Sequence, residues 1–257
     1  MPDYKNPPIA EAVCEFTFAP LKGNPEWDLT LPGKLQLHPD LKEYSGKSRQ
    51  QHMQTIAAGG NKGQPEFALQ QSLFRIHLPR PDNTALLSLG HNILGIVVLP
   101  PYEGWEKFEP RIIRTLEVFN KETGLSVVNR LGVRYINRIV TPNPDAASAA
   151  VYLRDMMTTI EAVAQDGKTK VQGKLTAFNS RHEFVTSEGI KIFVTQATLD
   201  PQTPKMAEYL LDIDTVWDHQ PLDGPKEITP VIDKLHTIEG AIFERFITAE
   251  ARKLFDA

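Results

Sequence analysis

The stretch from residue 130 to residue 140 constrains the fold of this chain more than any other. Its sequence, Arg-Leu-Gly-Val-Arg-Tyr-Ile-Asn-Arg-Ile-Val, repeats arginine at every fourth position, at Arg130, Arg134 and Arg138. Successive side chains of a strand point to opposite faces, so residues four apart share a face. The opposite face is mostly apolar. The pattern predicts a β-strand with one buried face and a cationic row about 26 Å long on the other.

A second strand is predicted at residues 9–18, near the start of the chain. Ala12, Cys14 and Phe16 alternate with polar residues, so they share one face of the strand. Glu11 and Glu15 lie four residues apart on the opposite face. This segment therefore presents an acidic pair in the same way that residues 130–140 present arginines.

Periodicity and turn residues predict the other elements. Residues 49–57, 67–78, 85–89, 93–99, 173–185, 190–199 and 208–217 are expected to be strands. Helices are expected at residues 25–29, 102–123, 146–160 and 229–255. Gly124 is placed to end the second helix, and Thr229 to cap the last one with Pro230 in its first turn.

This order predicts an α+β fold made of two similar halves, residues 1–124 and 125–257, which form one integrated unit. Each half reads strand, short helix, antiparallel meander, long helix. We expect the halves to share one antiparallel sheet, with both long helices on one face. The topology resembles the duplicated fold of the TATA-box-binding protein and of helix-grip proteins. That resemblance implies that residues 9–18 and 130–140 lie side by side at the centre of the sheet.

Composition narrows the class of protein. A net charge of −4 argues against a general nucleic-acid-binding protein. The single cysteine, Cys14, excludes an internal disulfide and any site with several cysteine ligands. Neither a secretory leader nor an apolar run of about 20 residues is evident, so we expect a cytoplasmic protein without a membrane segment.

Two interpretations of the arginine row remain open. Guanidinium groups suit phosphate and carboxylate, so Arg130, Arg134 and Arg138 can form an anion-binding surface. Alternatively, Glu11 and Glu15, with aspartates of residues 208–217, neutralise the arginines within a structural network. Unpaired buried arginines would be costly, which favours the second interpretation.

Asp212 and Asp214, in Leu-Leu-Asp-Ile-Asp, share a strand face and are candidate ligands for a divalent cation. The alternative is that they pair with the arginine row or are solvated. The histidines are scattered without metal-site spacing, and motifs for nucleotide or cofactor binding are missing. We therefore expect no cofactor and assign no catalytic residue.

Several motifs together resemble an uncharacterised, sporadically distributed bacterial protein family of about 250 residues. They are Pro-Pro-Ile-Ala-Glu-Ala-Val-Cys-Glu-Phe at residues 7–16 and Arg-Leu-Gly-Val-Arg-Tyr-Ile-Asn-Arg-Ile at residues 130–139. Tyr102, Trp105, and the pairs at residues 235–236 and 243–244 extend the resemblance over the chain. The family implies no known activity. Its patchy distribution suggests accessory genes such as toxin–antitoxin or phage-defence modules.

These observations predict a non-enzymatic binding protein that recognises a protein partner or a small anionic ligand on its sheet face. Arg130, Arg134, Arg138, Glu11 and Glu15 are the candidate contact residues. A metal-dependent enzyme acting on a nucleotide or phosphate ester, with Asp212 and Asp214 as metal ligands, is the alternative.

Overall fold

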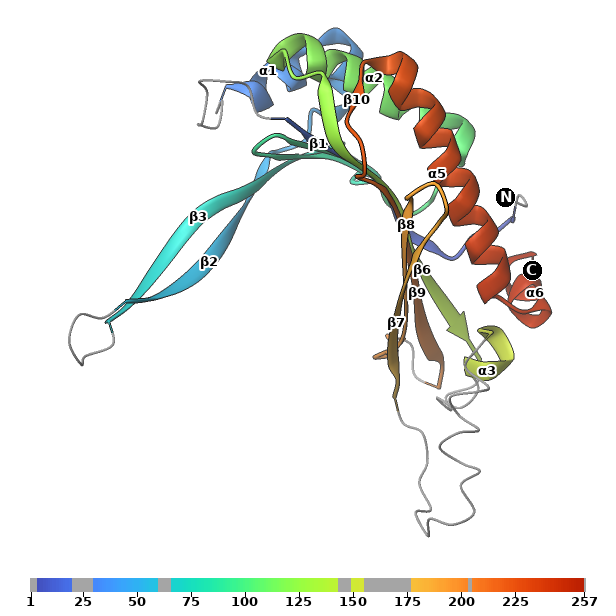
Figure 1. The fold of residues 1–257 in the computed structure, drawn as a ribbon. Helices are drawn as coiled ribbons and strands as arrows, with labels where there is room; N and C mark the ends of the chain where they lie inside the picture. Colours follow the sequence, from blue (N-terminus) through green and yellow to red (C-terminus); the bar gives the residue numbers. More distant parts are fainter. Residues whose placement is uncertain are drawn as a thin grey trace. The chain divides into compact units, whose positions relative to one another are not determined.

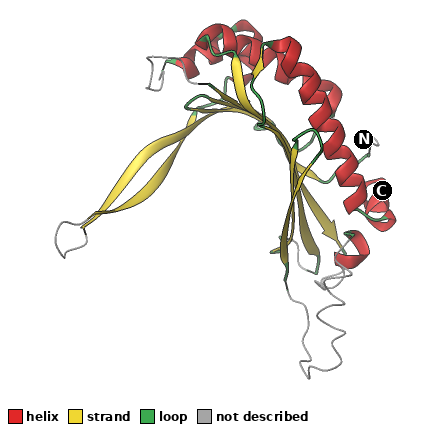
Figure 2. Ribbon diagram, in the orientation of Figure 1, coloured by secondary structure: helices red, strands yellow, loops and turns green. Residues whose placement is uncertain are grey.

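The protein has an α+β fold with a large antiparallel sheet and a few helices (Figures 1 and 2). The computed structural model describes residues 4–19, 30–59, 66–142, 149–154, 177–202 and 205–256. The chain forms two compact units. Unit 1 comprises residues 1–13, 130–220 and 226–257, and unit 2 comprises residues 14–129 and 221–225. The predicted boundary at residues 124–125 stays a prediction.

Unit 2 is built on a meander of antiparallel strands in the order β2-β3-β4-β5-β1. Its elements are the C-terminal part of β1 (Ile9–Phe18), α1 (Leu31–Leu37), the 3-10 helix η1 (Pro39–Tyr44), β2 (Arg49–Gly59), β3 (Glu66–Pro79), β4 (Ala85–Gly90), β5 (Ile93–Val98), α2 (Trp105–Thr123) and β10 (Leu222–Asp223). Phe18 of β1 stacks on Phe119 of α2, with ring centroids 5.0 Å apart. The apolar face of the C-terminal part of β1 is therefore buried against the apolar stripe of α2.

Unit 1 has a sheet in the order β1-β6-β9-β8-β7, to which β1 contributes its N-terminal part. Its other elements are β6 (Val127–Thr141), α3 (Ala149–Tyr152), β7 (Asn179–Val185), β8 (Lys191–Leu199), β9 (Ala207–Trp217), α5 (Pro225–Phe246) and α6 (Ala249–Asp256). Helix α5 lies along one face of this sheet (Figure 1). The Thr215 hydroxyl of β9 lies 2.9 Å from the Val133 carbonyl oxygen and 3.3 Å from the Leu235 carbonyl oxygen of α5, so the helix packs closely on the sheet here. The sheet face opposite α5 is called the open face below.

The strand predictions for residues 9–18, 85–89, 93–99, 190–199 and 208–217 are confirmed within one or two residues. The strand predicted at 130–140 is confirmed as β6, which begins three residues earlier. Within unit 1, β1 and β6 are neighbours, as predicted, and the Arg138 N–H donates to the Pro8 carbonyl at 2.7 Å. The predicted helix at 25–29, most of the helix at 146–160 and residues 173–176 lie outside the described residues.

The predicted start and continuity of the last helix were wrong. Helix α5 begins at Pro225, so Thr229 is not its cap and Pro230 lies inside it. The helix ends at Phe246 because the backbone groups there bond to the last residue of α3 and to the residues that follow it. Arg154 donates its backbone N–H to the Phe246 carbonyl, and Thr248 donates to Tyr152. These bonds interrupt the helical pattern, and a separate helix, α6, follows. No helix in the described ranges is long and apolar enough to cross a bilayer.

Gly124 ends α2 in the left-handed conformation, with φ +72° and its N–H donating to the Asn120 carbonyl. Only glycine adopts this conformation without steric cost, so Gly124→Ala should lower the free energy of unfolding by about 1 kcal/mol. Gly33 is the matched control, because it lies inside α1 with open space around its Cα. Gly33→Ala should stabilise the protein by about 0.5–1 kcal/mol. Urea denaturation of both variants checks the opposite signs.

Candidate functional site

The arginines of β6 pair with carboxylates of the neighbouring strand β9, and this set of ion pairs is called the charge ladder below. The β6–β9 register places Arg134 opposite Asp214, yet the guanidinium reaches diagonally to Asp212. Its Nε and Nη2 donate to the two carboxylate oxygens at 2.8 and 2.6 Å. This two-point geometry is the strongest arrangement for an arginine–carboxylate pair. With 45% of its side chain exposed, Arg134 is also the most accessible arginine of the ladder.

Arg138 pairs with Glu208 at one end of the charge ladder. The Glu208 side chain is only 2% exposed, whereas that of Arg138 is 31% exposed. The Gln202 backbone N–H also donates to Glu208, at 2.8 Å. A carboxylate removed from water in this way needs both donors, because burying an unpaired charge is very costly. The Arg138–Glu208 pair is therefore a structural element of unit 1.

Arg130 pairs with Asp214 at the other end, where the nearest charged atoms are 3.6 Å apart. Gly132 makes this contact possible. A Cβ at Gly132 would come within 3.3 Å of the Arg130 guanidinium and 3.4 Å of the Asp214 carboxylate. Because Gly132 has no side chain, the Arg130 side chain can pass over it toward Asp214. The nearest charged atoms of this pair are farther apart than those of the other two pairs of the ladder.

The two glutamates of β1 belong to different units. Glu11 lies beside Arg134 in unit 1, where burial raises the pKa of its carboxyl group and Arg134 opposes that rise. Glu15 lies in unit 2 and pairs with Arg75 of β3 at 2.9 Å. The prediction that Glu15 is a counter-charge of the arginine row stays a prediction. Sequence reasoning missed Arg75 and Glu208, because neither partner can be assigned before the strand pairing is known.

The charge ladder brings Asp212 and Asp214 together with the arginines, as the second interpretation of the row anticipated. Both oxygens of Asp212 accept hydrogen bonds from Arg134, so a cation would have to displace that guanidinium. The described part of the chain has no group of three or more histidine, cysteine or acidic side chains placed to hold a metal. An added anion would likewise compete with Asp212 for Arg134. The ladder is thus a balanced surface of fixed positive and negative groups.

The face of β6 and β9 turned toward α5 carries an unexpected set of buried polar side chains. Asn137 donates to the Leu211 carbonyl at 3.1 Å, and the Tyr135 hydroxyl lies 3.3 Å from Nδ1 of His236 in α5. Glu239, one helical turn further along α5, is fully buried. In the part of the chain that the structure describes, neither of its oxygens has a hydrogen-bond partner.

Burial shifts the ionisation of both α5 residues toward their neutral forms. It lowers the pKa of His236 to about 4 and raises the pKa of the Glu239 carboxyl group well above its usual value. Both groups are therefore uncharged in the folded protein over a range where the unfolded chain would carry charge. They contribute to the pH dependence of stability rather than to a surface site.

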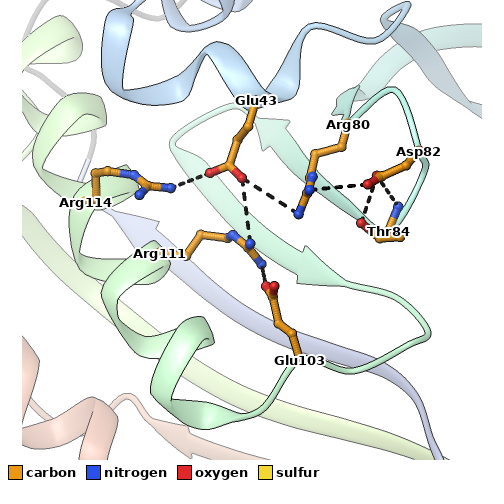
Figure 3. A network of polar contacts seen from close by, with 7 residues as sticks. All are labelled: Glu43, Arg80, Asp82, Thr84, Glu103, Arg111 and Arg114. Atoms are coloured by element: carbon orange, nitrogen blue, oxygen red, sulfur yellow. Dashed lines mark hydrogen bonds and ion pairs between the residues drawn. The ribbon is translucent and has the colours of Figure 1, made fainter.

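Unit 2 has a separate charged network, which Figure 3 shows at close range. Glu43 of η1 lies between three arginines, Arg80, Arg111 and Arg114, and contacts each of them. Arg111 is nearly buried and also pairs with Glu103. The network joins η1, α2 and the segment between β3 and β4, so its evident role is to hold these elements together. Nothing in the sequence pattern predicted it, since its members are far apart along the chain.

Comparisons with known protein families, curated proteins and solved structures gave no match to this chain.

The charge ladder predicts unequal costs for its members. Arg138→Ala leaves Glu208 buried without its guanidinium and should lower the free energy of unfolding by about 3 kcal/mol. Arg134→Ala removes a more exposed pair and should cost about 1 kcal/mol or less. Urea denaturation of the two variants tests this order. Equal costs would contradict the assignment of Arg138–Glu208 as the structural pair.

The lowered pKa of His236 predicts that the folded protein loses stability in acid. Between the unfolded pKa of about 6.5 and the folded pKa of about 4, only the unfolded chain binds the proton, so stability falls as the pH decreases. Partial exposure reduces the effect to about 1–2 kcal/mol between pH 7 and pH 5. His236→Gln removes this titration, so the variant should lose less stability than the wild type over that range in urea denaturation at each pH.

Glu239→Gln is the matched variant with the opposite sign. The folded pKa of Glu239 is raised, so its contribution to stability is present below about pH 4.5 and is lost as the pH rises. The variant should therefore gain stability relative to the wild type as the pH increases from 4.5 to 7. Parallel pH profiles for the wild type and both variants would refute the burial of these groups as neutral species.

Proposed function

We propose that this protein is an interaction protein whose unit 1 sheet recognises a protein partner through its open face. The observation that carries the proposal is the charge ladder, in which Arg134 and Arg130 remain about one-third to one-half exposed beside fixed carboxylates. Among the described residues of unit 1, helices lie on the side of α5, away from this face (Figure 1). Positive and negative side chains that alternate along a sheet favour binding to a partner surface with the complementary charge pattern.

A protein partner is better supported than a small anionic ligand. A small anion would have to take Arg134 from Asp212 and leave that carboxylate without its donors. A protein surface can instead contribute both charges and contact the whole ladder while the internal pairs persist. Beside the ladder, Phe193 of β8 lies opposite Asp214 and under the Arg181 guanidinium, 5.3 Å from its ring centroid. Arginine and aromatic residues are both enriched in protein–protein interfaces.

We also propose that the two halves of the chain arose by duplication. Helices α2 and α5 share a detail beyond the common element order. Each carries proline five residues after its first residue, Pro110 after Trp105 and Pro230 after Pro225. In both helices the residue two positions beyond that proline, Ile112 or Ile232, is fully buried. The equal spacing supports a common origin for the long helices.

A double charge reversal tests the proposed recognition face. In Arg134→Asp with Asp212→Arg the ion pair is kept but its direction is inverted, and the new aspartate lies beside Glu11, so the unfolding free energy should fall by about 1 kcal/mol. Partner recognition should fall by tenfold or more, because a complementary charge pattern now meets like charges. Quantitative affinity capture from the source cells, followed by calorimetry with the purified partner, measures the loss.

The control is the same kind of double exchange away from the face, Lys253→Glu with Glu250→Lys in α6, whose side chains are 70% and 53% exposed. This variant should capture the partner as the wild type does. If the double reversal binds as tightly as the wild type, the charge ladder is purely structural and the proposed face is wrong.

A further inference from the structure

Strand β7 is the last strand of the unit 1 sheet, and all its residues except Ser180 are exposed. No other strand among the described residues pairs with its outer edge. Phe184 and Val185, with 46% and 62% of their surface accessible, are among the few exposed large apolar residues of the described chain. An edge strand with exposed apolar residues is a template for pairing with another strand unless something blocks it.

The outward backbone groups of β7 can be identified from its pairing with β8. Thr198 donates to the Phe178 carbonyl, and Thr186 donates to the Ile190 carbonyl, so residues 178 and 186 bond toward β8. The register between β7 and β8 runs without a shift. Because alternate residues bond to opposite edges of a strand, the N–H and C=O groups of the odd-numbered residues point outward. These residues are Asn179, Arg181, Glu183 and Val185.

Strand β7 itself lacks several features that usually protect an edge strand. It has no proline, no lysine and no bulge. Its two charged residues, Arg181 and Glu183, lie two positions apart on the open face. Charged side chains on an edge strand discourage another strand from pairing there. Arg181 and Glu183 have opposite signs, so their effect depends on the charges of the incoming strand. A strand that carries the same two charges in reverse order is therefore attracted and not repelled.

An antiparallel copy of β7 is such a strand. When two copies pair about a twofold axis through His182, Arg181 of each copy faces Glu183 of the other, and Asn179 faces Val185. All four facing positions are the outward-bonding ones, so each facing pair can exchange two backbone hydrogen bonds. The two Arg–Glu contacts are cross-strand pairs of opposite charge. The strand is self-complementary in both backbone and charge, as a twofold interface requires.

We propose that the protein forms a twofold dimer by antiparallel pairing of β7 with β7 of a second copy, centred on His182. This assembly would join two unit 1 sheets edge to edge and cover Phe184 and Val185. It does not depend on the proposed function of the charge ladder, because its charged contacts come from Arg181 and Glu183 of β7, which are not members of that ladder.

Charge exchange between two variants tests the register directly. Arg181→Glu gives a strand with two acidic residues, and Glu183→Arg gives one with two basic residues. Each variant alone would place like charges face to face, so its dimer dissociation constant should rise about tenfold or more above that of the wild type. An equimolar mixture of the two variants restores opposite charges at every facing pair and should dimerise as the wild type does.

Analytical ultracentrifugation over a range of concentrations measures the three dissociation constants. Lys226→Glu in α5 is the control, since it reverses an exposed charge outside β7 and should leave the dimer unchanged. Circular dichroism establishes that each variant is folded. The proposal is overturned if the wild type sediments as a monomer at all concentrations. It is also overturned if both variants dimerise like the wild type, or if the mixture of monomeric variants fails to associate.

Discussion

The antiparallel pairing of β6 with β9 is the interaction on which the rest of unit 1 depends. A single register, with Tyr135 opposite Ile213 and Arg134 opposite Asp214, decides the character of both faces of the sheet. On one face it brings apolar and aromatic side chains beneath α5. On the other it brings the arginines within reach of the carboxylates. A slip of one residue would move both sets to the wrong face, so the hydrophobic and ionic patterns select the same register.

The two charged systems of the protein differ in what their burial implies. In unit 2, Glu43 contacts three arginines, one of which is nearly buried, and its contacts join elements far apart in the sequence. Removing one of these side chains would leave a partly buried charge without an opposite charge beside it. This cost is typical of a network that stabilises the fold. In the charge ladder of unit 1, the pairs lie in a row along two strands. Such a row adds little stability per exposed pair, so stability alone does not account for its more accessible members.

Local patterns predicted the parts of the fold that local physics decides. Alternation placed β1 at residues 9–18, and the glycine rule placed the end of α2 at Gly124, because both depend on side-chain direction and backbone conformation along one segment. Contacts between distant segments could not be predicted in the same way. Arg75 could not be identified as the partner of Glu15 before the position of β3 in the sheet was known. Glu208 could not be identified as the partner of Arg138 before the β6–β9 register was known. The start of α5 was missed because Thr229-Pro230 imitates a cap inside a longer helix.

The burial of the carboxylates along the charge ladder is graded, and under the proposed function this gradient favours one end of the ladder for contact with a partner. At the Arg138 end, Glu208 is almost inaccessible and is also held by a backbone N–H. Any exchange of partners there would leave a buried carboxylate without donors. At the Arg130 end, the ion pair is longer and Asp214 is more accessible, so a partner's charges can approach at a smaller desolvation cost. Recognition should therefore centre on Arg130 and Arg134, while Arg138 and Glu208 hold the strands that carry them.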